Sequence, residues 1–169
     1  MAITYVAIAT TTVGSGGAAT IEFTSIPGTY TDLLIKLSGR STHSSIDPVF
    51  ITFNGTATST TSYRSIFGNG ATAASYNGTG AQIQYIPGTG QTASTFNNAE
   101  VYIPNYAGSN NKSFSIDAVQ ETNAATAYIV PMACLWSNTA AITSITLDPA
   151  TGDFAQYSTA TLYGIKNTV

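Results

Sequence analysis

The sequence predicts an all-β protein with the architecture of an antiparallel β-sandwich. Composition is the first reason, because the 169 residues include 28 Thr and 17 Ser but only 6 Leu, 3 Glu and 3 Lys. Helices are usually built from Leu, Glu and Lys, whereas Thr, Val, Ile, Tyr and Phe favour strands. Pattern is the second reason, because short alternating runs recur at roughly even spacing between Gly, Pro and Asn. No 11-residue window carries the apolar stripe of a helix.

The first half of the chain contains five candidate strands, over 3–12, 18–25, 33–40, 48–55 and 62–70. In the third of them, Leu33, Ile35 and Leu37 share one face because alternate side chains of a strand point to the same side. The fourth run ends in Asn54-Gly55, which is a strong tight-turn pattern, and the fifth ends in a second Asn-Gly pair. Each run is therefore expected to be one strand closed by a turn.

The second half opens with an expected exposed loop over 68–80, where GNGATAASYNGTG has little to bury. Six more runs follow, and the second and third of them are expected to pair as a hairpin around SNN: 81–90, 99–108, 112–120, 125–136, 142–148 and 159–166. These ten or eleven runs predict about 8–11 strands, in a sandwich or a barrel, and the inward faces favour two sheets. No repeat or composition shift divides the chain, so one domain is expected over 1–169.

Charge is unusually scarce. Only 8% of residues are charged, the net charge is −3, and the five basic residues are scattered. This argues against a nucleic-acid partner, which needs clustered Lys and Arg. No run approaches the roughly 20 apolar residues of a membrane span, so no membrane partner is expected. A surface of hydroxyls and amides suits packed assemblies, because little charge is desolvated at a contact.

The stretch GRSTHSSIDP (39–48) contains the only histidine, His43, close to Ser41, Ser44 and Asp47. A catalytic serine normally stands on a sharp turn and takes its base from elsewhere in the fold. Here the candidate residues are near neighbours on one polar run. We therefore expect a solvated linker between two strands, in which Arg40 and His43 remain candidates for contact with a partner subunit.

Other catalytic and metal chemistry has little support. A glycosidase needs two carboxylates at a set separation in a cleft, and spacing alone cannot exclude a pair among the eight present. One His and one Cys argue against a transition-metal site, and Cys134 is expected to be a buried, inert thiol. Asp148 and Asp153 flank a turn that resembles an oxygen-rich calcium-binding loop, but an ordinary turn is favoured. We predict no enzyme activity and no cofactor.

Four aromatic residues are the candidates for ligand or partner contact: Tyr63, Phe67, Tyr76 and Tyr85. They surround the expected loop 68–80, where their rings could stack on sugars. Isolated aromatics in a β protein are also common in cores and interfaces, so a packing role stays open.

Several stretches together resemble a known group: IEFTSIPGTYTDLLIKLSGRS (21–41), ITFNG (51–55), YRSIFGNG (63–70) and LWSNTAAITSITLDPATGDFAQYSTATLYGIK (135–166). They are similar to small virion structural proteins of tailed bacteriophages. The chain departs from the group where Gln156-Tyr157-Ser158 replaces a usual Gly-Ser, which affects a turn.

The resemblance implies a jelly-roll-like β-sandwich that serves as a capsid decoration (cement) protein or as a tail or fibre component. It carries no catalytic residues. It implies core anchors at Tyr30 and Leu33, a turn at Pro27-Gly28, and packing of Trp136 and of the strand 162–165.

Three functions follow as expectations. The first is a cement protein on the virion surface that bridges copies of the major capsid protein, or other virion proteins, as a homo-oligomer, with a trimer expected first. The second is a tail-fibre or receptor-binding module that holds host polysaccharide near loops 68–80 and 87–95. The third is a glycan depolymerase, which the near absence of His and the few carboxylates disfavour.

Overall fold

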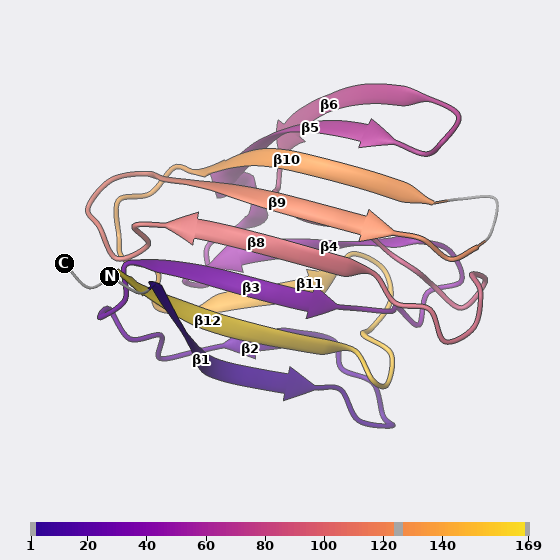
Figure 1. The fold of residues 1–169 in the computed structure, drawn as a ribbon, viewed down its shortest axis with the longest axis horizontal. Helices are drawn as coiled ribbons and strands as arrows, with labels where there is room; N and C mark the ends of the chain where they lie inside the picture. The colour runs from indigo at the N-terminus through magenta and orange to yellow at the C-terminus, as the bar shows by residue number, and fades with distance from the viewer. Residues whose placement is uncertain (1–2, 124–126, 168–169) are drawn as a thin grey trace.

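The computed structural model describes residues 3–123 and 127–167 (Figure 1). This part of the chain forms twelve β-strands and one short 3-10 helix. In chain order they are β1 (Ile3–Thr12), β2 (Ile21–Phe23), β3 (Asp32–Ser38), β4 (Asp47–Phe53), η1 (Thr58–Thr60), β5 (Thr61–Gly68), β6 (Ala73–Thr79), β7 (Gln82–Ile86), β8 (Asn98–Pro104), β9 (Lys112–Gln120), β10 (Tyr128–Trp136), β11 (Ile145–Pro149) and β12 (Thr159–Asn167). The all-β prediction is confirmed, with one strand above the expected 8–11.

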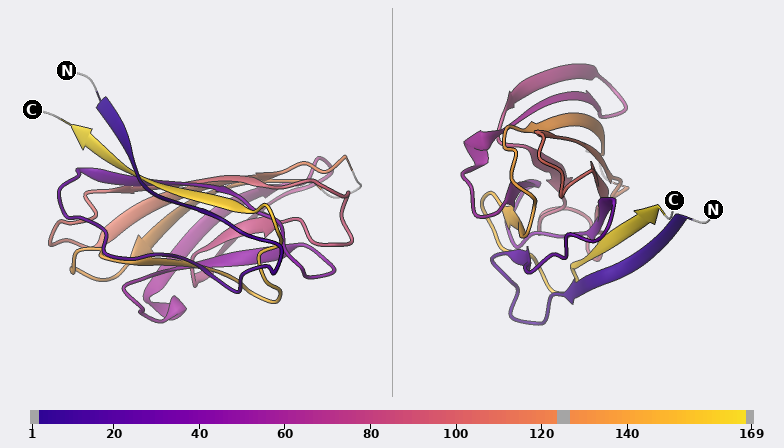
Figure 2. Two further views of the ribbon diagram at one scale, coloured as in Figure 1. Left: turned by 90° about the horizontal axis from the view of Figure 1, so that it is seen from below. Right: turned by 90° about the vertical axis from the view of Figure 1, so that its left-hand side faces the viewer.

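The strands form two antiparallel sheets that stack as a β-sandwich (Figures 1 and 2). The large sheet has eight strands in the order β1-β12-β3-β8-β9-β10-β5-β6, and the small sheet has four in the order β2-β11-β4-β7. The edge strand β7 lies against β9 of the large sheet. Because the large sheet has twice as many strands, β5 and β6 continue past the edge of the small one (Figure 1).

The core fills the space between the sheets. Alternation is strict in β9, whose nine residues are buried and exposed in turn. At the centre, the ring of Phe53 packs edge-on against Phe114 at 5.2 Å and lies 5.3 Å from the ring of Trp136. Aromatic pairs at such distances contribute about 0.5–1.5 kcal/mol beyond the area they bury. The inward side chains of both sheets therefore form one continuous core.

The predicted turns and the hairpin form as expected. Asn54 and Gly55 both have positive φ values, 52° and 65°, which fits a tight turn. Strands β8 and β9 pair antiparallel around residues 105–111. The positions singled out by the resemblance are structural: Leu33 and Trp136 are fully buried, and Tyr30 packs against the core.

The prediction of an exposed loop over 68–80 is wrong, because residues 73–79 form the edge strand β6. It pairs with β5 from Ser62↔Thr79 to Gly68↔Ala73. None of its residues is buried, so no apolar face was selected in its sequence. Backbone hydrogen bonds to β5 hold the strand, and side-chain periodicity carries no information about such pairing.

Candidate functional site

Ser41, His43 and Asp47 do not form a catalytic triad. The Ser41 hydroxyl donates a 2.7 Å hydrogen bond to the Asp47 carboxylate and accepts one of 3.0 Å from the backbone N–H of His43, not from its ring. Asp47 also accepts a 2.9 Å bond from the N–H of Gly152. The expected solvated linker is corrected for Ser41 and Asp47, which are fully buried. These hydrogen bonds connect the segment 41–47 to the turn at Gly152, and Ser41 and Asp47 are buried between them.

The loop 87–95 is fastened to the body of its own chain by Arg40. The guanidinium donates hydrogen bonds of 2.8–3.3 Å to the carbonyl oxygens of Gly88, Gln91, Thr92 and Thr95. Burial lowers the pKa of Arg40. The side chain is therefore an internal clamp, and contact of Arg40 with a partner subunit stays a prediction.

Two further cationic side chains also bond to groups of their own chain. Lys112 is buried, donates to the carbonyls of Gly108 and Asn110 at 2.6 Å, and has a pKa lowered by burial. Lys36 forms an ion pair with Glu100 on the surface. Arg64 differs, because among the described residues its guanidinium bonds only to the carbonyl of its neighbour Tyr63.

Neither the candidate calcium ligands nor the thiol forms a reactive site. Asp148 is exposed in β11, and the exposed Asp153 uses its N–H to bond the Thr42 hydroxyl at 2.9 Å. Within the described residues no group of three or more His, Cys, Asp or Glu lies close enough to hold a metal ion. Burial raises the pKa of Cys134 to about 12. Such a thiol carries little of the thiolate that nucleophilic attack requires.

The four aromatic candidates do come together, with Tyr128, beneath the overhanging strands β5 and β6. The rings of Phe67 and Tyr76 are 5.9 Å apart, those of Phe67 and Tyr128 are 5.0 Å apart, and those of Tyr85 and Tyr128 are 4.8 Å apart. Burial raises the pKa of Tyr85, and the neighbouring tyrosines, including Tyr63, add to this effect. Tyr76 is the exposed member of this cluster, at 51%.

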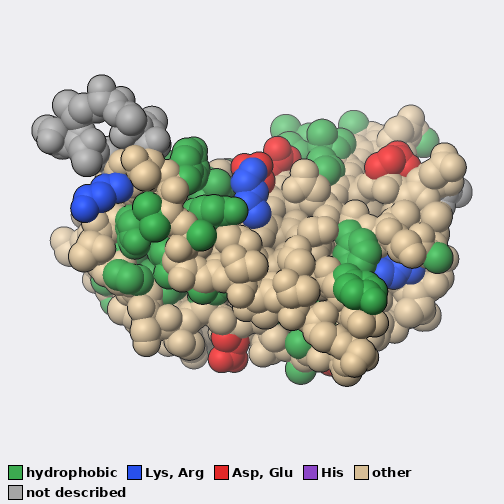
Figure 3. All heavy atoms as spheres, turned by 60° about the horizontal axis from the view of Figure 1, so that its bottom comes forward, with side chains coloured by type: hydrophobic (Ala, Val, Ile, Leu, Met, Phe, Trp, Pro, Cys, Tyr) green, Lys and Arg blue, Asp and Glu red, His purple; other side chains and the backbone are tan. Residues whose placement is uncertain are grey.

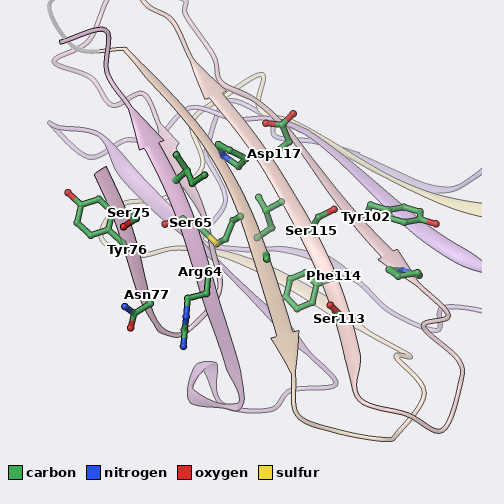
Figure 4. Close-up of a pocket in the computed structure, with 16 residues that line it drawn as sticks. Arg64, Ser65, Ser75, Tyr76, Asn77, Tyr102, Ser113, Phe114, Ser115 and Asp117 are labelled. Carbon is green, nitrogen blue, oxygen red and sulfur yellow. The ribbon is translucent and has the colours of Figure 1, made fainter. Parts of the chain in front are cut away.

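A hollow lies on the opposite, outer face of the large sheet. It has a volume of about 860 Å³ and crosses β6, β5, β10, β9 and β8 (Figure 4). We call it the outer groove, and its outward-facing side chains are Arg64, Ile66, Ser75, Asn77, Tyr102, Pro104, Ser113, Ser115, Asp117, Pro131 and Ala133. Ligand pockets typically measure about 300–1,000 Å³.

Strand register explains why these side chains share one face. Tyr102 is in register with Ser115, Ser115 with Ala133, Ala133 with Arg64, and Arg64 with Asn77. Residues directly opposite on antiparallel strands point to the same side of the sheet. The five therefore form one row across five strands, with small side chains in the middle and longer ones towards both ends.

The Tyr102 ring is held in place at one end of the row. Its hydroxyl donates a 2.9 Å hydrogen bond to Asp32, which also accepts a 2.9 Å bond from the N–H of Asn105. Burial and the bond to Asp32 raise the pKa of Tyr102. The ring is still 38% exposed, so one surface remains open to a ligand.

Sequence reasoning did not select the residues of the outer groove. Arg64, Ser115 and Asp117 occupy the polar positions of alternating strands, which also describes an ordinary solvated face. Only the order of the strands within the sheet brings them into one hollow. Tyr76 was selected, but it is in register with the buried Ser65 and its ring packs against Phe67, on the inner side of β6.

Charged side chains are scarce in the sequence and on the face drawn in Figure 3, where a minority of blue and red side chains lies among uncharged atoms. In the described part of the chain, no helix is long and apolar enough to cross a membrane. Comparisons with protein families, with curated proteins and with solved structures find no match to this chain.

Proposed function

We propose that the chain is a non-enzymatic structural protein of a virion, a capsid decoration or cement protein that bridges neighbouring capsid subunits. The observation that carries this proposal is the chemistry of the free edges of the large sheet. Neither edge strand, β1 or β6, contains a charged residue or a proline. Soluble proteins usually protect free edges with Lys, Pro, a β-bulge or a covering segment, and β1 carries one of these, a bulge between Ala7 and Ala9. Edges without Lys or Pro suit pairing with a strand of another subunit.

Side chains along the two edges support the same role. Tyr5 and Val6 of β1 are 58% and 38% exposed, and Tyr76 of β6 is 51% exposed. Pairing of β1 with β6 of the next copy is a head-to-tail contact, which closes into a ring when the rotation between copies allows it. A trimer is the ring we expect, and each contact adds little charge desolvation.

The order of strands supports a jelly roll as the underlying fold. Numbered 1 to 8 in chain order, the strands β1, β2, β3, β4, β7, β8, β11 and β12 form the rows 1-8-3-6 and 2-7-4-5. This is the arrangement of two Greek keys in a jelly roll, and β5–β6 and β9–β10 then extend one sheet. Viral capsid proteins and lectins both use this architecture, so the fold is compatible with more than one role.

Purified particles of the virus that encodes the chain test this proposal. Mass spectrometry should detect the protein, and electron cryomicroscopy should place it at junctions between capsid subunits. For the isolated protein, multi-angle light scattering should show oligomers that Ala7→Lys and Ser75→Lys dissociate. Ala150→Lys, in an exposed bend, is the control and should leave the oligomers intact. Purified particles without the protein would contradict the proposal.

A second candidate function is a tail-fibre or receptor-binding module that recognises host surface polysaccharide. The outer groove, with an exposed tyrosine and several free polar groups, favours it.

A further inference from the structure

The polar groups of the outer groove are free to bind a ligand. Among the described residues, the side chains of Ser75, Asn77, Ser115 and Asp117 have no hydrogen-bond or ion-pair partner, and Arg64 uses one N–H only. Together they offer hydroxyl, amide, carboxylate and guanidinium groups, which include both donors and acceptors. A ligand rich in hydroxyl groups matches this mixture, because each hydroxyl can donate and accept.

Charge selects a neutral ligand. The groove is lined by one cation, Arg64, and one anion, Asp117, while Glu100, opposite Asp117 on β8, is paired with Lys36. A nucleic acid needs several Lys or Arg for its phosphates, and a phosphorylated ligand would meet one cation and one carboxylate in the groove. An added peptide strand needs free backbone groups, which the interior strands of the sheet have already paired.

Shape selects an extended ligand. The row from Tyr102 to Asn77 crosses five strands, which at about 4.8 Å per step spans about 19 Å. Its middle is low, because Ser115 and Ala133 are small, and Tyr102 stands at one end (Figure 4). The hydrogen bond to Asp32 keeps that ring in position before a ligand arrives, and pre-organisation of this kind lowers the entropic cost of binding.

We propose that the outer groove binds a neutral, extended oligosaccharide across β8, β9, β10, β5 and β6. One pyranose ring stacks on Tyr102, and its neighbours place their hydroxyls against Ser115, Arg64, Asn77 and Asp117. The proposal rests on the second candidate function and names its ligand class. The inner aromatic cluster of Phe67, Tyr76 and Tyr128 takes no part in it.

Isothermal titration calorimetry with defined oligosaccharides tests the site. Cellopentaose and maltopentaose are the neutral probes, pentagalacturonate is the acidic one, and glucose tests whether length matters. A neutral pentasaccharide should bind, pentagalacturonate should bind at least about tenfold more weakly, and glucose should give no heat, because it spans a single step of the row. Tighter binding of pentagalacturonate, or equal binding of glucose, would contradict the proposed ligand class.

Two variants locate the binding. Tyr102→Ala removes the stacking ring, and Ser115→Trp fills the floor of the groove from an exposed position without touching the core. Each should raise Kd at least about tenfold. Tyr157→Ala is the control, because Tyr157 is 68% exposed and lies outside the groove, and it should bind like the unmodified protein. Circular dichroism checks that Tyr102→Ala is folded, and Ser115→Trp carries the test if it is not.

The outcomes separate the site from the function. If a neutral pentasaccharide binds and both groove variants bind it unchanged, while Tyr76→Ala loses it, the groove assignment is wrong and glycan recognition stands. If no probe binds with a Kd below about 10 mM, both the groove assignment and the second candidate function are wrong. The cement proposal is tested apart from these, because the groove variants should leave the oligomeric state unchanged.

Discussion

Gly164 lies directly against the ring of Tyr30. A Cβ atom at position 164 would stand 2.4 Å from Cγ of that ring and 2.5 Å from both Cδ atoms. Strand β12 is therefore required to have no side chain at this point, so that Tyr30 can lie flat over the pairing of β12 with β1 and β3. The backbone N–H of Tyr30 also bonds to the buried Tyr106 hydroxyl at 3.4 Å, which anchors the turn to the core.

Gly164→Ala should destabilise the protein by about 1–3 kcal/mol, because the ring or the strand must move to admit the methyl group. Urea unfolding followed by fluorescence measures the loss. Gly28→Ala is the matched control, since a Cβ at Gly28 meets no atom within 4 Å. Equal stability of the two variants would show that Tyr30 moves aside at no cost.

Ser41→Ala should cost about 1–3 kcal/mol, because the buried Oδ2 of Asp47 loses one of its two donors and keeps only the N–H of Gly152. His43→Ala should change the free energy of unfolding by no more than about 0.5 kcal/mol, since the contacts within the network are made by its backbone. Both free energies come from urea titrations of the purified variants. A large loss in His43→Ala alone would overturn the structural interpretation of this segment.

Arg40→Ala should loosen the loop 87–95 while leaving the two sheets folded. Its guanidinium satisfies four carbonyl oxygens of that loop, and alanine would expose them to water. Hydrogen exchange should accelerate at amides of the loop, and not in β9 or β10. Arg64→Ala removes a guanidinium that, within residues 3–123 and 127–167, bonds only to its neighbour, and it should leave the exchange of the loop unchanged.

Cys134 should resist thiol reagents in the folded protein. Its pKa is raised by burial from 9.0 to about 12, so at pH 8 its thiolate population is about a thousandfold lower than in an unfolded chain. Labelling by a chromogenic disulfide such as Ellman's reagent should be slow in buffer and complete within minutes in urea. Fast stoichiometric labelling of the native protein would contradict the buried position. Cys134→Ser controls for background colour.

The strands that face the core could be predicted, because burial leaves a mark on sequence. Leu33, Ile35 and Leu37 recur at every second position and are all buried, and the Asn54-Gly55 pair marks a turn that does form. The strand β6 could not be predicted, because none of its residues is buried and backbone pairing places no demand on side chains. The sequence identified the aromatic candidates one by one, but only the fold brings the rings of Phe67 and Tyr85 against the same partner, Tyr128.

By itself, the sequence determined the all-β class, most of the strands and the scarcity of charge, since these depend on local propensity and composition. Only the tertiary structure decided which polar side chains bond within the chain and which stay exposed to a ligand. It buried Ser41 and Asp47 in a network, used Arg40 as an internal clamp, and left Arg64 exposed in the outer groove. The physical reason is that hydrogen bonds between distant segments depend on the order of strands in the sheets, which local sequence does not encode.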